Sequence, residues 1–277
     1  MFKTWLIRSL SGIVYIGAII GCIFWGWLPF SILAAIIGVM AVFEFEKICE
    51  GITVNSLPLT ILDSVGVVFL CFGSLFYPLL GWIMVILCRL ILQLYTQNEK
   101  PIRSVAISLA TQVYIGIPLM LMNIIGAWWH MHLLLAIFLM IWINDTGAFV
   151  VGSLLGKHRL FERISPKKSW EGFFGGLGFT LLAGWLFCIG GRYFWDVDWN
   201  VITWLIFAFV ITIFATWGDL VESLIKRSLN IKDSGHIMPG HGGVLDRIDS
   251  LLLVMPAVFL FVVVCFHIFP YRLMTNF

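Results

Sequence analysis

The chain has 277 residues, of which 61% are hydrophobic and only 12% are charged, with a formal net charge of +2 and a mean hydropathy of +1.01. This composition lies far outside the range of soluble globular domains, so a soluble enzyme is excluded. We expect an all-α, polytopic integral membrane protein, with the lipid bilayer as a partner and no nucleic acid.

Apolar stretches close to the length that crosses a bilayer recur along the whole chain and predict about nine transmembrane helices. Their approximate ranges are 10–29, 30–49, 58–77, 78–96, 104–126, 131–153, 172–193, 201–225 and 249–270. The divisions near Pro29 and Pro78 depend on very short turns. At each of them the two neighbouring stretches could alternatively form one re-entrant unit.

The distribution of lysine and arginine predicts the orientation, because these residues are preferentially retained on the cytoplasmic side. With the N-terminus inside and the C-terminus outside, the outer segments hold only Arg192 and Arg272, and Arg89 falls within a span. The inner segments then collect Lys3, Arg8, Lys47, Lys100, Arg103, Lys157, Arg159, Arg163, Lys167, Lys168, Lys226, Arg227, Lys232 and Arg247. An error of one helix would destroy this segregation, which therefore supports nine spans with the N-terminus inside and the C-terminus outside. The expected location is the cytoplasmic membrane, with the active site facing the cytoplasm.

Acidic residues near the ends of the second and third predicted spans include Glu44, Glu46 and Asp63. They could reach an inner cavity or simply face water, and we favour the second interpretation. Asn144 and Asp145 differ, because they lie inside the sixth predicted span. An intramembrane acid usually marks a functional site, although an interhelical hydrogen bond is the simpler alternative.

Ser165-Pro-Lys167-Lys168-Ser-Trp-Glu-Gly precedes the seventh predicted span. Paired lysines beside hydroxyl groups at a membrane surface attract phosphate. Taken alone, such a pair would most often be a topology signal. The adjoining proline, serines and tryptophan favour a binding edge.

Asp219, Glu222, Ser223 and Lys226 follow a spacing that places them on one helix face. Glu222 and Lys226 alone would suit an ordinary salt-bridged helix end. Asp219 ends an apolar stretch, where an unpaired carboxylate is costly, so we interpret it as a metal ligand in preference to a structural ion pair.

A second charged segment begins at His241 and continues through Gly242 and Gly243 to Asp246 and Asp249. Adjacent glycines let backbone N–H groups approach phosphate oxygens, and a helix starting near residue 245 would direct its positive end at them. Two carboxylates at helical spacing suit Mg²⁺. The alternative is helix capping by Asp246, with the neighbouring arginine as a surface anchor.

These segments together resemble the signature of the phosphatidate cytidylyltransferase family, also called CDP-diacylglycerol synthases. The matching elements are Ser223-x-Ile-Lys226-Arg227, Lys232-Asp233-x-Gly235 and Pro239-x-His241-Gly242-Gly243-Val-x-Asp246-Arg247-Ile-Asp249. Met238 departs from the pattern by exchanging one apolar side chain for another. Residues 1–130 match the family in hydropathy and length only.

The resemblance implies an enzyme that joins CTP to phosphatidic acid and requires Mg²⁺. Asp219 and Asp246 would hold the metal, with Asp249 and Asp145 as secondary candidates, and the surplus of acids leaves room for a second cation, a monovalent ion among the alternatives. The other expected catalytic residues are Lys226, Arg227 and His241. The expected substrate-binding residues are Ser165, Lys167, Lys168, Ser223, Lys232, Asp233, Arg247 and Asn144, with the backbone of Gly242 and Gly243.

The resemblance also implies a homodimer. Residues 1–130 would form a scaffold, and residues 131–277 a catalytic region with cytoplasmic loops at 156–171 and 226–248. Two other functions are weighed against this one. A CTP-dependent polyprenol or lipid kinase would transfer the γ-phosphate, and a transporter would place its charges near the membrane midplane.

Overall fold

A computed structural model describes residues 2–53, 55–73, 76–195, 197, 199–235 and 242–266. Helices dominate it, and seven of them in the described chain are long and apolar enough to cross a membrane. Two shorter apolar helices, at Ser11–Trp25 and Leu57–Cys71, accompany them. An all-α polytopic class is therefore confirmed, while the count of about nine spans and their orientation stay predictions. His241 lies outside the described residues.

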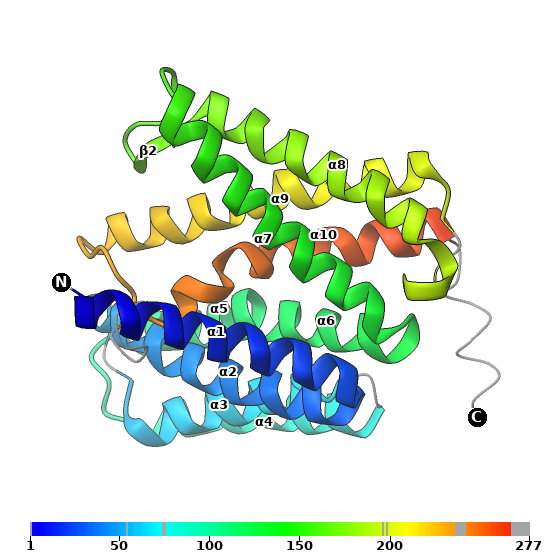
Figure 1. The fold of residues 1–277 in the computed structure, drawn as a ribbon. Coiled ribbons are helices and arrows are strands. Elements are labelled where there is room, and N and C mark those ends of the chain that lie inside the picture. Colours follow the sequence, from blue (N-terminus) through cyan, green and yellow to red (C-terminus); the bar gives the residue numbers. More distant parts are fainter. Residues whose placement is uncertain are drawn as a thin grey trace.

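The first four helices are α1 (Phe2–Trp25), α2 (Trp27–Ile48), α3 (Leu57–Cys71) and α4 (Phe76–Tyr95). Consecutive helices pack together and run in alternating directions (Figure 1). A short 3-10 turn, Cys49–Gly51, extends α2.

The helix boundaries near the two prolines differ from the predicted ones. The first break falls at Gly26, whose φ of 122° lies in the left-handed region, and Pro29 sits in the first turn of α2. Pro78 likewise lies in the first turn of α4, after α3 has ended at Cys71. Proline is tolerated there because the first backbone N–H groups of a helix have no partner within it. Both prolines thus lie just inside a helix rather than at the division.

The middle of the chain forms one continuous helical segment and one further helix. The segment consists of α5 (Pro101–Thr111), a π-helical turn (Gln112–Gly116) and α6 (Ile117–Trp128). The helix α7 (Met131–Leu155) follows and crosses the molecule diagonally in Figure 1. Its buried residues join those of α2, α6, α9 and α10 in one apolar core.

The last part of the chain holds the strands β1 (Arg159–Phe161) and β2 (Ser165–Ser169), followed by α8 (Trp170–Trp195), α9 (Val201–Ser228) and α10 (Leu245–Phe266). The two strands form an antiparallel hairpin, where the sequence predicted only a loop. Glycines let α7 and α8 approach closely, since a Cβ added at Gly175 would lie 2.3 Å from the Cβ of Val151.

Alternate connections gather at one end of the molecule, which we call the polar end. There lie the connectors α2–α3, α4–α5, α7–α8 and α9–α10, together with the start of α1 (Figure 1). This arrangement brings the two predicted loops, 156–171 and 226–248, to the same end. Residues that are far apart in the sequence therefore lie at the same end because successive helices run in alternating directions.

Candidate active site

The last turns of α9 supply the first part of the site. Asp219, Ser223 and Lys226 share one helix face, as their spacing predicts. The Ser223 hydroxyl donates to Oδ1 of Asp219 at 3.2 Å. The Lys226 ammonium lies 3.3 Å from Oε1 of Glu222, which is fully buried. This face points into the protein at the polar end.

The strand β2 supplies a second cation. Nζ of Lys168 lies 2.8 Å from Oδ2 of Asp219 and donates to the carbonyl of Thr216 at 3.2 Å. Successive residues of a strand point to opposite faces, and the preceding Lys167 is exposed. The structure therefore separates the predicted lysine pair. Ser165 begins the same strand and is half-buried.

The start of α10 supplies the third part, centred on Asp246. One carboxylate oxygen accepts from Nζ of Lys226 at 2.5 Å, and the other accepts from the backbone N–H groups of Gly243 at 2.9 Å and Ser234 at 3.2 Å. Asp246 thus binds the segment before its own helix and also forms an ion pair with α9. Its role as a metal ligand stays a prediction.

Gly242 shows why this turn needs glycine. Its φ is +84°, and an added Cβ would lie 2.8 Å from Oδ2 of Asp246. A side chain there would strain the backbone and collide with the carboxylate. The helix begins at Leu245, as predicted.

Acidic side chains from three helices surround these contacts. Asp145 of α7 and Asp249 of α10 are both close enough to Asp219 to interact electrostatically, and Asp249 interacts in the same way with Glu222. The Glu222 carboxyl group contacts the Lys226 ammonium through Oε1 and also interacts with the Asp249 side chain. Five carboxyl groups therefore share the ammonium groups of Lys168 and Lys226, so the region holds more acidic than basic side chains. Glu222 was not predicted as a site residue, although its spacing from Asp219 pointed to it.

The donor set fits a hard cation that arrives with a polyphosphate. Within the described part of the chain, no three His, Cys, Asp or Glu side chains are arranged to hold a metal ion by themselves. Mg²⁺ commonly takes one or two protein carboxylates and completes its coordination with phosphate and water. The surplus of carboxyl groups over lysines is consistent with that mode.

Four other predicted site residues lie at the surface of the polar end. Arg227 is exposed and donates to the carbonyl of Ile231 at 3.1 Å, which closes the end of α9. Lys232 and Asp233 are exposed in the following connector. Arg247 is also exposed, and its carbonyl accepts from the Tyr15 hydroxyl at 3.3 Å.

Asn144 occupies a different environment from these residues. It is 2% exposed, and its side-chain oxygen Oδ1 faces α8, where a Cβ added at Gly176 would lie only 2.6 Å from that oxygen. Its side-chain amide lies 3.5 Å from Oδ1 of Asp145. These contacts place it beside Asp145 in a helix interface, and its predicted substrate contact stays a prediction.

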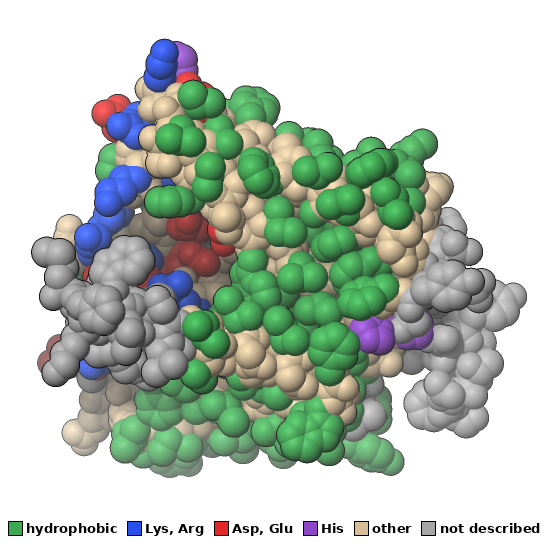
Figure 2. Space-filling view, viewed as in Figure 1, with side chains coloured by type: hydrophobic (Ala, Val, Ile, Leu, Met, Phe, Trp, Pro, Cys, Tyr) green, Lys and Arg blue, Asp and Glu red, His purple; other side chains and the backbone are tan. Residues whose placement is uncertain are grey.

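The surface view shows how this region is reached. Figure 2 shows acidic and basic side chains inside a hollow toward the polar end, on a face that is otherwise largely hydrophobic. Asp219 and Lys168 are partly accessible, with 38% and 23% of their side-chain surface exposed. A charged hollow in an apolar face can admit a ligand that has both a polar head and an apolar body.

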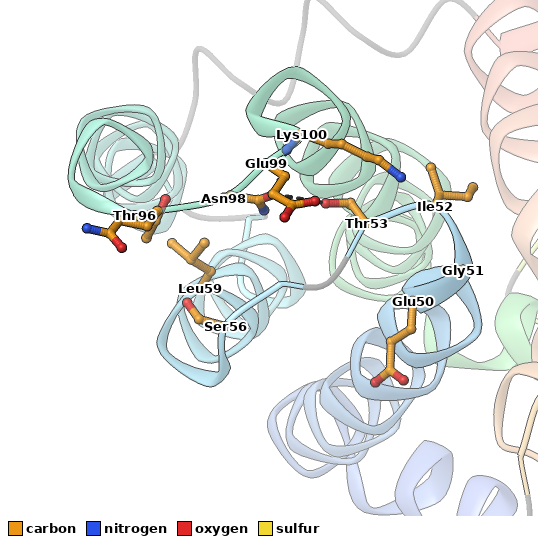
Figure 3. Close-up of a pocket in the computed structure, with 11 residues that line it drawn as sticks. Glu50, Gly51, Ile52, Thr53, Ser56, Leu59, Thr96, Asn98, Glu99 and Lys100 are labelled. Atoms are coloured by element: carbon orange, nitrogen blue, oxygen red, sulfur yellow. Dashed lines mark hydrogen bonds between the residues drawn. The ribbon is translucent and has the colours of Figure 1, made fainter.

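Two cavities lie beside the connectors of the polar end. Figure 3 shows one of about 540 Å³, bordered by Glu50 and Thr53 on one side and by Asn98 and Lys100 on the other. None of the described residues that line it belongs to the predicted site. The second, of about 700 Å³, lies between α2 and residues 231–235 and includes Asp233.

The fold defines a polytopic membrane protein that gathers acidic and basic side chains of several helices at its polar end. The model of the cytidylyltransferase family matches residues 6–265, and the chain belongs to that family. It is therefore a nucleotidyltransferase enzyme, and the resemblance seen in the sequence motifs is confirmed.

Named relatives agree with this assignment. The chain is 33% identical over 259 residues to the phosphatidate cytidylyltransferase of Staphylococcus aureus (strain COL), covering 90% of this chain and 96% of the relative. Its identity to the phosphatidate cytidylyltransferase of Staphylococcus saprophyticus is 40% over 163 residues, covering 58% of this chain and 60% of the relative. The Staphylococcus epidermidis enzyme of the same name is also 40% identical, over 161 residues, with the same coverage.

Proposed function

We propose that this enzyme transfers the cytidylyl group of CTP to phosphatidic acid, giving CDP-diacylglycerol and pyrophosphate. The observation that carries the proposal is the charged hollow in an apolar, membrane-crossing fold. One substrate is a soluble polyanion and the other is anchored in the bilayer, so the site has to meet both water and lipid. The names of the relatives support the same reaction.

The chemistry needs alignment and charge neutralisation more than a strong base. A phosphate oxygen of phosphatidic acid attacks the α-phosphorus of CTP in line. A new P–O bond forms while the bond from the α-phosphorus to the bridging oxygen breaks, and pyrophosphate leaves with that electron pair. The nucleophile is already anionic at neutral pH, because the second pKa of a phosphate monoester is about 6. The protein must bring two anions together and stabilise the leaving group.

Lysine side chains held by acids are suited to that task. Lys226 lies between Asp246 and Glu222, and Lys168 pairs with Asp219, so both ammonium groups are fixed in the site before a substrate enters. An arriving phosphate gives them a second anionic partner. In this proposal Lys226, Arg227 and Lys232 bind the triphosphate, and Lys168 with Ser165 binds the lipid phosphate or pyrophosphate.

The carboxylates provide the metal ligands in this proposal. Asp219 and Asp246 would hold Mg²⁺, with Asp249 and Asp145 as secondary ligands. When bound, the cation neutralises phosphate charge in the transition state. Release of the two lysines from Asp219 and Asp246 would make both carboxylates available. The remaining surplus of acids leaves a place for a second cation.

The proposed orientation places the polar end at the cytoplasm. Most lysine and arginine residues outside the helices lie in its connectors, and CTP reaches a membrane enzyme from the side where nucleotides are made. A homodimer in the cytoplasmic membrane completes the proposal. The mass of the detergent-solubilised protein, measured by light scattering with the detergent contribution subtracted, tests the dimer directly.

The position of the radiolabel tests the reaction. Purified protein in detergent receives phosphatidic acid, Mg²⁺ and CTP labelled with ³²P at either the α- or the γ-phosphate. We expect the α-label in a lipid product and the γ-label in pyrophosphate. A lipid that carries the γ-label would instead identify a kinase. No labelled lipid from a folded preparation would contradict both reactions and favour transport.

A further inference from the structure

Glu44 connects the first half of the chain to the site, whereas the sequence analysis favoured exposure of this residue to water. It lies near the end of α2 and is only 3% exposed. Its Oε2 accepts from the backbone N–H of Leu245 at 2.9 Å and from the Ser234 hydroxyl at 3.3 Å. These partners follow it in the chain by 201 and 190 residues. A buried carboxylate therefore joins a residue within the α9–α10 connection to the first residue of α10.

The surrounding backbone is shaped to admit this carboxylate. A Cβ added at Gly235 would lie 2.6 Å from Oε1 of Glu44, and one added at Gly243 would lie 2.5 Å from its Oε2. Glycine at both positions leaves the space that the side chain fills. Leu245 is the first residue of α10, so the negative charge also meets the positive end of that helix.

The groups that contact Glu44 are the same groups that hold Asp246. Ser234 donates its hydroxyl to Glu44 and its backbone N–H to Asp246, at 3.3 and 3.2 Å. Gly243, which packs against Glu44, donates its N–H to Asp246 at 2.9 Å. A displacement of Glu44 would therefore shift the donors that orient the Asp246 carboxylate.

We propose that Glu44 is a positioning residue, which fixes the start of α10 and the turn before it so that Asp246 faces the metal and the triphosphate. The inference rests on the proposed function. Groups that orient a metal ligand typically change metal affinity by about 10–100-fold when they are removed. Glu44 would then set the affinity of the site for Mg²⁺ without touching the substrate.

The test compares Glu44→Ala with Glu44→Gln and Glu46→Ala. Glu46 is a matched control, because it is also buried in α2 and its Oε2 accepts from Asn55 and Thr60, away from the connection. We expect Glu44→Ala to raise the Mg²⁺ concentration for half-maximal activity about tenfold or more. Glutamine retains an acceptor oxygen, so Glu44→Gln should change that value less than about threefold. Glu46→Ala should leave it unchanged.

A second readout does not depend on turnover. The rise in melting temperature produced by Mg²⁺ and CTP reports binding to the folded protein, and it should shrink in Glu44→Ala but not in Glu46→Ala. If Glu44→Ala does not fold, Ser234→Ala removes one of the two donors and should raise the half-maximal Mg²⁺ concentration about threefold. Unchanged Mg²⁺ dependence in the Glu44 and Ser234 variants, or equal changes at Glu44 and Glu46, would overturn the inference. If the proposed reaction is wrong, the wild-type protein will transfer no α-label. The rise in melting temperature with Mg²⁺ and CTP, compared between wild type and Glu44→Ala, would still test the role of Glu44.

Discussion

Two groups of charged side chains lie between the helices of this protein, and they differ in how completely their members are paired and enclosed. In the first half, the Arg89 guanidinium donates to Asp63, Gln93 and Ser104, and the Ser108 hydroxyl donates to the second oxygen of Asp63. Arg89 and Asp63 are 1% and 0% exposed. This network joins α3, α4 and α5, and its central ion pair is enclosed.

The group around Asp219 contains the same kinds of side chain but more acids than bases. Its carboxyl groups outnumber the ammonium groups of Lys168 and Lys226, and part of it is accessible, with 38% of the Asp219 side chain exposed. An intramembrane acid therefore does not by itself identify a functional site. A surplus of acidic over basic side chains, together with exposure to solvent, distinguishes a candidate binding site from an enclosed structural ion pair.

Removal of Mg²⁺ should have the largest effect on activity, and it should act on the group around Asp219 and not on the Asp63–Arg89 network. A chelator such as EDTA should abolish label transfer, because two polyanions cannot approach without a counter-charge. Added Mg²⁺ in excess should restore the activity. The melting temperature without CTP should change little, since the Asp63–Arg89 network needs no metal. Activity that persists through exhaustive chelation would remove the metal from the proposal.

Asp219→Asn and Asp246→Asn should have the next largest effect. Loss of one group that stabilises transition-state charge typically costs about 10²–10³ in rate. We expect each variant to lose at least about 100-fold in transfer of the α-label while remaining folded by size-exclusion chromatography. If one variant retains activity, the metal would be assigned to Asp145 or Asp249, whose asparagine variants should then be inactive.

The lysines of β2 should give a smaller and unequal effect. Lys168→Ala removes the cation that contacts Asp219, and we expect a loss of about tenfold in kcat/KM, equivalent to about 1.4 kcal/mol. Lys167→Ala is the matched control, because it lies one residue away on the other face of the strand. Its loss should stay below about threefold at physiological salt. Equal losses would show that the two lysines attract phosphate only through their general charge.

Arg89→Met should affect stability and leave the chemistry unchanged. The substitution leaves Asp63 buried without its cation, which typically costs about 3–5 kcal/mol. We expect a lower melting temperature but an unchanged KM for CTP in the molecules that stay folded. The double variant Asp63→Leu, Arg89→Met should recover part of the lost stability. A change in the Mg²⁺ dependence of either variant would contradict the separation of the two groups.

Much of the fold followed from local patterns. Apolar stretches determined where most helices lie, and the spacing of Asp219, Ser223 and Lys226 placed them on one face, because helix geometry depends on neighbours within one or two turns. The start of α10 at Leu245 was predicted from the glycines before it. The breaks near Pro29 and Pro78 were misplaced by a few residues, since proline fits the first turn of a helix as well as the end of one.

Tertiary structure decided the contacts between distant segments. The sequence did not show that Lys168 rather than Lys167 faces Asp219, because that depends on the orientation of a strand pairing that was not predicted. Nor did it show that Arg89 would be paired with Asp63. Glu44 meets Leu245 across 201 positions, and no local spacing reports such a contact. The sequence by itself determined the membrane class, the family and a set of candidate site residues, because these depend on local composition and motifs. The packing of α2, α7, α9 and α10 determined which of their charged side chains are paired and which are buried.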